Sequence, residues 1–225
     1  PAPGPAPAAP RPRRRRRVLA VLVAVLLVGG AAGGGAYLAT HHTPNRGGTG
    51  QPDGGDTAAP ATESAAPTGQ VPSGGPAPAG YVWQDDPDGY RFLLPTTDGT
   101  WTRVEEGGQV YYSPDARVHY LQFAVTVGQP LTPLQHFEEM ELSVSKNLKE
   151  YQSTGPVAAR INDREGAVWE FSYTAKDGTR RHAKEAEFRN TDGTSYAVYV
   201  SGPEKDWVQS LRRFTTVLNN FTPKR

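Results

Sequence analysis

From Ala167 to Gly202 the sequence reads AVWEFSYTAKDGTRRHAKEAEFRNTDGTSYAVYVSG. In its first part a large aromatic residue occupies every second position, which is the period of a half-buried strand. Asp177-Gly178 and Asp192-Gly193 are dipeptides typical of tight hairpin turns. The segment therefore predicts a meander of three antiparallel strands, with a polar middle strand over Arg180–Arg189.

The same period of two predicts further strands toward the N-terminus. They run over residues 90–94, 101–105, 109–113 and 118–127. Pro95 closes the first of them, and the Gly107-Gly108 turn joins the second and third as a hairpin. The chain therefore offers enough antiparallel strands for one sheet.

Two amphipathic helices complete the predicted domain. Thr132 is a good N-cap, Pro133 suits the first turn, and Gln135 completes a capping box. An apolar stripe at helical spacing follows, made of Phe137, Met140, Val144, Leu148 and Tyr151. Gly155-Pro156 ends this helix. The second helix starts at Pro203-Glu204, and its apolar side consists of Trp207, Leu211, Phe214 and Leu218. The fold class is α+β, an antiparallel sheet with two packed helices.

The N-terminal part differs in composition from this domain. A basic run, Arg11–Arg17, leads directly into Val18–Thr40, which contains no charge. As a helix the latter would span roughly 34 Å, enough for a hydrocarbon core about 30 Å thick. The positive-inside rule places the basic flank in the cytoplasm. We expect a cytoplasmic segment (1–17), a transmembrane helix in the lipid bilayer (18–40), a disordered Gly/Pro/Thr-rich tether (41–80) and an extracytoplasmic α+β domain (81–225).

Several alternatives stay open for the apolar segment. The small residues Gly34 and Ala36 also suit the cut site of a secretory signal peptide. Gly29 and Gly33 lie four apart, a spacing that lets two helices pair as a homodimer. The Pro/Ala tract at residues 1–10 is compatible with a lost initiator Met or with a longer cytoplasmic linker. The oligomeric state is not predicted.

Charge and cysteine content exclude some function classes. Residues 1–80 hold seven Lys and Arg against three Asp and Glu, whereas residues 81–225 hold seventeen against twenty. A mildly acidic domain argues against nucleic acid as a partner, because phosphate binding requires a basic face. The absence of cysteine excludes disulfides, thiolate metal sites and cysteine nucleophiles.

The sequence predicts no catalytic, cofactor-binding or metal-binding residue. His136 begins a zincin-like pattern, but Met140 stands where the second ligand would be, so a solvated helix residue is favoured. On the polar strand, Glu185 and Glu187 share one face, which predicts an exposed charged surface rather than an acid–base pair.

Two other side chains of this strand and one acidic loop are the remaining candidates for a site. His182 and Lys184 lie on the opposite face of the polar strand from the two glutamates. The acidic run Asp85-Asp86-Pro87-Asp88 lacks the rest of an EF-hand, so a turn is expected there.

Several short motifs resemble those of the PsbP-like α/β/α sandwich. They are Gly89-Tyr90-Arg91-Phe92 with Pro95 and Trp101, Trp169-Glu170-Phe171, Gly193–Tyr199 and Trp207. The arrangement is similar to the transmembrane plus extracytoplasmic C-terminal region of actinobacterial receptor Ser/Thr protein kinases. The resemblance covers roughly residues 83–221 together with the membrane layout.

The resemblance implies a non-catalytic sensor that binds an unknown extracytoplasmic ligand or envelope component. No kinase motif occurs in the chain, so any kinase activity would lie upstream of Pro1. The alternative is a stand-alone anchored or secreted envelope binding protein with no kinase. The ligand itself is not predicted.

Overall fold

The computed structural model describes residues 75–224. Its strands are β1 (Tyr81–Asp86), β2 (Tyr90–Pro95), β3 (Thr102–Glu106), β4 (Gln109–Ser113), β5 (Tyr120–Val127), β6 (Lys149–Ser153), β7 (Val157–Ile161), β8 (Arg164–Thr174), β9 (Arg180–Arg189), β10 (Thr194–Pro203) and β11 (Thr222–Pro223). The helices are α2 (Pro133–Asn147), the short 3₁₀ turn η1 (Glu204–Asp206) and α3 (Trp207–Asn219).

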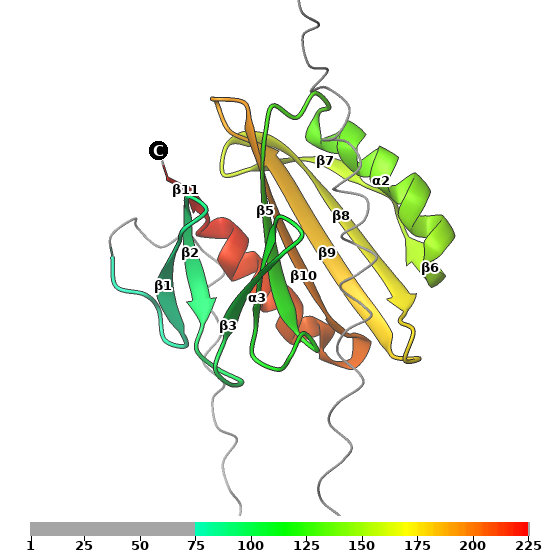
Figure 1. Cartoon of the computed structure of the whole chain (residues 1–225), viewed down its shortest axis with the longest axis horizontal. Coiled ribbons are helices and arrows are strands. Elements are labelled where there is room, and N and C mark those ends of the chain that lie inside the picture. Colours follow the sequence, from blue (N-terminus) through cyan, green and yellow to red (C-terminus); the bar gives the residue numbers. More distant parts are fainter. Residues whose placement is uncertain (1–74, 225) are drawn as a thin grey trace, which may run out of the picture.

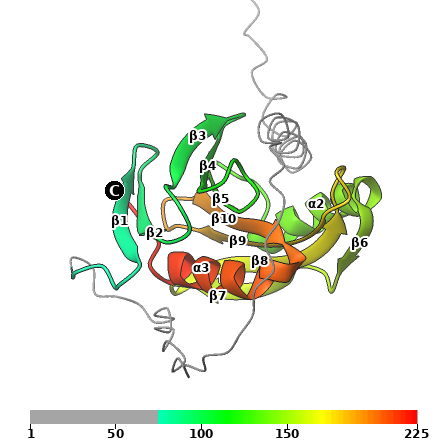
Figure 2. The ribbon, with the colours of Figure 1, turned by 90° about the horizontal axis from the view of Figure 1, so that it is seen from below.

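A large antiparallel sheet forms the centre of the domain (Figure 1). Seven of its eight strands follow the order β3-β4-β5-β10-β9-β8-β6, and the eighth, β7, pairs with β8. The predicted meander β8-β9-β10 is confirmed, as is the β3–β4 hairpin. Helices α2 and α3 lie on opposite sides of this sheet, which gives an α/β/α sandwich (Figure 2). The predicted α+β class is therefore confirmed.

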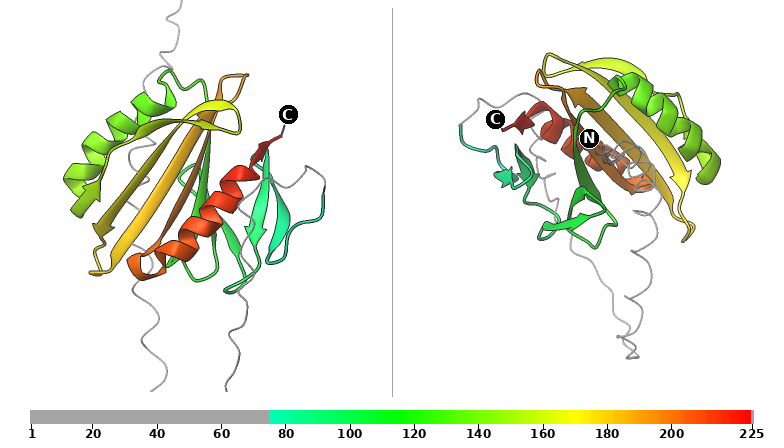
Figure 3. Two further views of the ribbon diagram at one scale, coloured as in Figure 1. Left: turned by 180° about the vertical axis from the view of Figure 1, so that it is seen from behind. Right: turned by 45° about the horizontal axis from the view of Figure 1, so that its top comes forward.

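A second, three-stranded sheet of order β1-β2-β11 lies on the same side as α3 (Figure 3). Together they cover one apolar face of the large sheet. Phe123 of β5 is the hub of this core, since its ring lies 4.5 Å from Phe92, 5.1 Å from Tyr90 and 6.1 Å from Phe221 between centroids. The aromatic motif near Tyr90 thus contributes to the core.

Helix α2 packs mainly on β8, on the other face of the sheet. Phe137 and Met140 contact a cluster around Trp169, whose indole is 1% exposed. The predicted capping box at Thr132 and Gln135 is present in full. These features confirm where the helix begins.

The predicted end of this helix is wrong. Helix α2 ends at Asn147, and residues 149–153 form β6, which pairs with β8. Tyr151 still faces inward from this strand, where its hydroxyl donates to Glu141 Oε1 at 2.7 Å and lies 3.1 Å from the Trp169 Nε1. The free edge of the long strand β8 offers backbone partners that outweigh one more helical turn.

Besides β6 and the two-residue β11, two further strands have no counterpart in the sequence-based prediction. β1 pairs with β2 around a turn at Asp86–Gly89, and β7 pairs with β8 around Asn162-Asp163. Asn162 and Asp163 both have positive φ, 47° and 63°, as a type I′ hairpin turn requires. The Asn162-Asp163 dipeptide is therefore the sequence feature that indicates the β7–β8 hairpin.

Within residues 75–224, no helix has the length and apolar character needed to cross a lipid bilayer. The membrane helix expected over residues 18–40 lies outside the described residues. So do the cytoplasmic segment 1–17, the Gly29/Gly33 face and the tether as far as Gly74.

Candidate functional site

A polar pocket lies on the face of the large sheet that α2 only partly covers. Its lining side chains come from β4, β5, β9, β10 and α2, and they are Gln109, Gln122, Ala124, Thr126, His136, Met140, Glu185, Glu187, Ser195 and Ala197. Its volume is about 20 Å³, which is room for a group about the size of one water molecule.

Strand β9 supplies the two acidic residues of the pocket. Glu185 and Glu187 share one face, as predicted, but their expected exposure is wrong, because they are only 6% and 2% exposed. The cause is helix α2, which covers this face of β9. His182 and Lys184 lie on the opposite side, where both contact Glu170.

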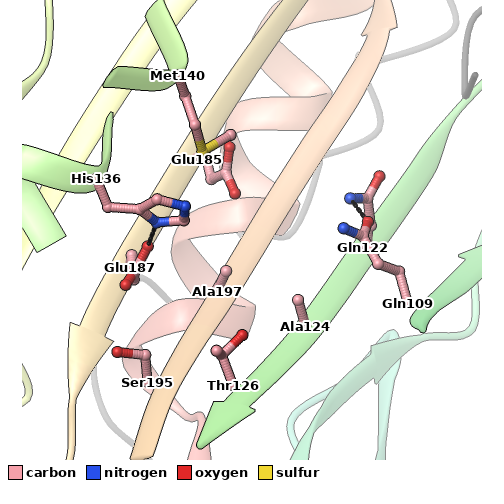
Figure 4. Close-up of a pocket in the computed structure, with 10 residues that line it drawn as sticks. All are labelled: Gln109, Gln122, Ala124, Thr126, His136, Met140, Glu185, Glu187, Ser195 and Ala197. Carbon is pink, nitrogen blue, oxygen red and sulfur yellow. Dashed lines mark hydrogen bonds and ion pairs between the residues drawn. The ribbon is translucent and has the colours of Figure 1, made fainter. Parts of the chain in front are cut away.

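Helix α2 supplies the basic residue of the pocket. His136 was expected to be solvated, but its Nδ1 lies 2.5 Å from Glu187 Oε2 (Figure 4). Burial disfavours the charged imidazole, yet the hydrogen bond and negative charge of Glu187 outweigh burial and raise the pKa of His136. The raised pKa favours a charge-assisted hydrogen bond between this imidazole and Glu187.

Glu185 has a different environment from its neighbour. Burial, followed by repulsion from Glu187, raises its pKa to about 8, and His136 opposes this only in part. The Glu185 side chain is therefore mostly protonated at neutral pH. A buried carboxylic acid on β9 thus lies beside the contact between Glu187 and His136.

Three buried polar atoms of the pocket have no hydrogen-bond partner in the protein. They are Glu185 Oε2, Glu187 Oε1 and Ser195 Oγ. An unpaired buried polar atom costs roughly 1–3 kcal/mol. A ligand or solvent molecule that donates hydrogen bonds would remove this cost.

The opposite side of the pocket is uncharged (Figure 4). Gln122 of β5 donates its amide to Gln109 of β4. Ala124 and Ala197 lie between this amide pair and the acidic side, and they leave the sheet face open because their side chains are small. The pocket thus has one ionisable side and one neutral side.

Within residues 75–224, no group of three or more His, Cys, Asp or Glu side chains is arranged to hold a metal ion. The acidic run at Asp85–Asp88 forms the expected turn between β1 and β2. Asp86 there accepts from Arg103 Nε at 2.9 Å and from Tyr112 Oη at 2.7 Å. Its carboxylate therefore has a structural role.

A second histidine cluster resembles a catalytic triad only superficially. His119 Nδ1 lies 2.6 Å from Asp115, and its Nε2 lies 3.2 Å from Asp206. The nearby Ser210 hydroxyl is buried beside Gly202 and is not hydrogen-bonded to the imidazole. Because both ring nitrogens face carboxylates, neither is placed to take a proton from Ser210.

Structure comparisons identify the fold. The chain is similar to cyanobacterial PsbP (CyanoP) from Synechocystis sp. PCC 6803, with a TM-score of 0.51 and 19% identity over 69% of this chain and 98% of that one. It is also similar to LpqN of Mycobacterium tuberculosis, with a TM-score of 0.44 and 15% identity over 64% of this chain and 90% of that one. The first likeness establishes a PsbP-like fold.

Sequence comparisons identify the family. No curated protein matches the chain significantly in sequence. The model of the family described as "Serine/threonine kinase C-terminal domain" matches residues 82–223. This range includes both helices, every residue of the polar pocket and, except for Tyr81, both sheets. The chain therefore belongs to the serine/threonine kinase C-terminal domain family.

Proposed function

We propose that this chain is the membrane-anchored, extracytoplasmic ligand-binding part of a receptor Ser/Thr protein kinase. The kinase domain would precede Pro1, and the chain itself would carry no catalysis. Family membership supports the link to a kinase. The uncharged segment Val18–Thr40 and its Arg flank support the anchor and the orientation.

The observation that carries the ligand-binding role is the polar pocket. Sheet faces in a folded core are normally apolar, and buried carboxylates are rare unless paired. Here Glu185 is buried with an unpartnered oxygen, in a pocket whose opposite side is formed by neutral amides. Buried polar groups that the fold itself does not use are typical of binding sites.

Signalling would follow from a change in how two anchors pair. A ligand that binds differently to two arrangements of the receptor shifts their populations. The Gly29/Gly33 spacing suits such pairing of membrane helices. The cytoplasmic kinase would respond to the changed distance between protomers.

Membrane topology is tested first, with an epitope tag placed after Arg225 of the complete polypeptide. Protease added to intact cells should remove the tag, and the tag should fractionate with membranes. A tag protected inside the cell would refute the extracytoplasmic placement. Soluble domain in the medium would refute the anchor.

The role of the pocket is tested by filling it. Ala197→Phe places a large side chain in the pocket, and we expect it to change kinase autophosphorylation in cells by at least severalfold. Ala158→Phe is the matched control, because Ala158 is exposed on β7, outside the pocket. Equal phosphorylation in both variants and the parent would refute the sensor role. A gene product with no kinase domain would favour the stand-alone envelope protein.

A further inference from the structure

The unpartnered atoms of the pocket are all able to accept a hydrogen bond. Glu185, Glu187 and Ser195 are at least nine-tenths buried, with exposed fractions of 6%, 2% and 3%. Each places one oxygen without a partner at the pocket. His136, the basic residue of the lining, already contacts Glu187. None of these three oxygens receives a hydrogen bond from the protein, and the basic residue of the lining is already paired with Glu187.

We infer that this pocket binds the primary ammonium group of a small organic cation. The inference rests on the proposed function, because it specifies the ligand class of the same site. An ammonium group carries three N–H donors and one positive charge. Its three donors therefore match in number the three unpartnered oxygens, two of which belong to carboxyl groups, and its charge is balanced when Glu185 gives up a proton.

The size and the outer lining of the pocket support the same ligand. A volume of about 20 Å³ accommodates one group the size of water, which is close to the size of an ammonium head. Ala124, Ala197 and Met140 supply apolar surface beside the acidic side. An alkyl stem attached to the ammonium group would pack against these residues.

Other ligand classes fit the site less well. An anionic head would meet the carboxyl group of Glu187 at close range and would donate no hydrogen bond to the three unpartnered oxygens. A divalent cation requires several converging ligands, which the described residues do not provide. A quaternary ammonium is larger and has no N–H donor, so it would leave the same three oxygens unpartnered.

Binding of a cation would be coupled to loss of a proton. Glu185 faces His136 of α2, Glu187 of its own strand, and the neighbouring Tyr199 and Trp169 of β10 and β8. Tyr199 stays neutral because burial raises the pKa of its phenol. The ammonium group therefore displaces the proton of Glu185 to water, and the resulting carboxylate accepts an N–H bond.

The test is an NMR titration of the full chain in detergent micelles, with ¹³C-labelled glutamate carboxyl groups. The probe is ethylammonium chloride, and the controls are tetramethylammonium chloride and sodium propionate at equal ionic strength. We expect saturable shifts with ethylammonium only. Because one proton leaves, the Kd should fall about tenfold between pH 6 and pH 7.

Three variants test which side chains of the pocket bind the ammonium group. Glu185→Gln should weaken binding at least tenfold and abolish its pH dependence, since a charge-assisted hydrogen bond is lost. Glu138→Gln makes the same carboxyl-to-amide change at an exposed position of α2 outside the pocket, and its Kd should stay within about twofold. Ser195→Ala, which leaves no buried charge, should weaken binding severalfold without affecting the fold.

Equal affinity for ethylammonium and tetramethylammonium would overturn the inference, as would unchanged binding to Glu185→Gln. If ethylammonium fails to bind while Ala197→Phe still changes phosphorylation, the ligand class is wrong and the proposed sensor role stands. If ethylammonium binds as expected while Ala197→Phe leaves phosphorylation unchanged, the ligand class stands and the sensor role is wrong.

Discussion

The two faces of the large sheet are built from the same strands but have opposite characters. On β5, Phe123 points into an aromatic core, whereas Gln122 and Thr126 line the polar pocket. On β10, Val198 joins the core and Ser195 lines the pocket. Alternation at period two thus puts an apolar and a polar surface on opposite sides of each strand.

The two faces differ in how much of each is covered by packed helices and strands. The α3 face is closed by α3 and by the β1-β2-β11 sheet, so it forms a continuous core. On the other face α2 packs mainly on β8 and leaves β5 and β10 less covered. We infer that the α3 face supplies most of the stability and that the uncovered half of the α2 face supplies the binding site.

Truncation of the core hub should have the largest effect. Phe123 is 1% exposed, and Phe123→Ala should lower the free energy of unfolding by about 3–5 kcal/mol. Urea unfolding followed by tryptophan fluorescence measures this change. Thr126→Ala on the same strand but on the pocket face should cost less than about 1 kcal/mol. Equal losses would contradict the division between the two faces.

Removal of a buried charge at the α3 side should have the next largest effect. Asp86→Asn breaks the contacts with Arg103 and Tyr112, and breaking such a pair costs about 3 kcal/mol. Burial opposes the carboxylate, but hydrogen bonds from Arg103 and Tyr112 outweigh it and lower the pKa of Asp86. This contribution is present above pH 3.8 and is lost as pH falls through the lower, folded pKa. Urea unfolding between pH 2 and pH 6 should show this loss in the parent and not in Asp86→Asn.

The pocket face should respond to pH in the opposite direction. The pKa of Glu185 rises from 4.5 to about 8 on folding, so the folded state binds more protons between these values. Its contribution is complete below pH 4.5 and is lost as pH rises through about 8, at up to about 1.4 kcal/mol per pH unit. His136, whose pKa is also raised, contributes in the same direction above its ordinary value.

Glu185→Gln isolates this effect. The variant should flatten the decline in the free energy of unfolding between pH 5 and pH 8, and Glu138→Gln should keep the parent slope. Urea unfolding at one-unit pH intervals measures both slopes. A parent slope that survives in Glu185→Gln would show that another group causes it.

Local patterns predicted most of the fold because each was decided by neighbouring residues. The Asp-Gly turns, the period of two in the meander and the capping box at Thr132 are all local, and the structure confirms them. The error at Tyr151 arose because helical and strand periods both place this residue inward. Only the pairing of β6 with β8, across about twenty residues of sequence, decides between them.

The site was less predictable because its parts are far apart in sequence. Period two correctly placed Glu185 and Glu187 on one face of a strand, but it gave no information on what covers that face. The covering residue, His136, lies 51 positions from Glu187. Charged residues are mostly exposed in proteins, so exposed side chains were expected for Glu185 and Glu187. This expectation is wrong because helix α2 covers their face of β9.

The smallest expected effect concerns the start of the helix that bounds the pocket. Thr132 accepts from the backbone N–H of Gln135, whose side chain returns a bond to the backbone of Thr132. Thr132→Ala should lower the free energy of unfolding by about 1 kcal/mol, measured by urea unfolding.

Since His136 follows one turn later and its backbone N–H donates to the Thr132 carbonyl, fraying of this turn should also loosen the imidazole contact with Glu187. The ¹³C carboxyl shift of Glu187 and the affinity for ethylammonium should therefore change in Thr132→Ala, whereas Thr132→Ser, which keeps the cap, should match the parent. A loss of stability with no change at Glu187 would mean that the position of His136 is fixed by packing on the sheet and not by the helix cap.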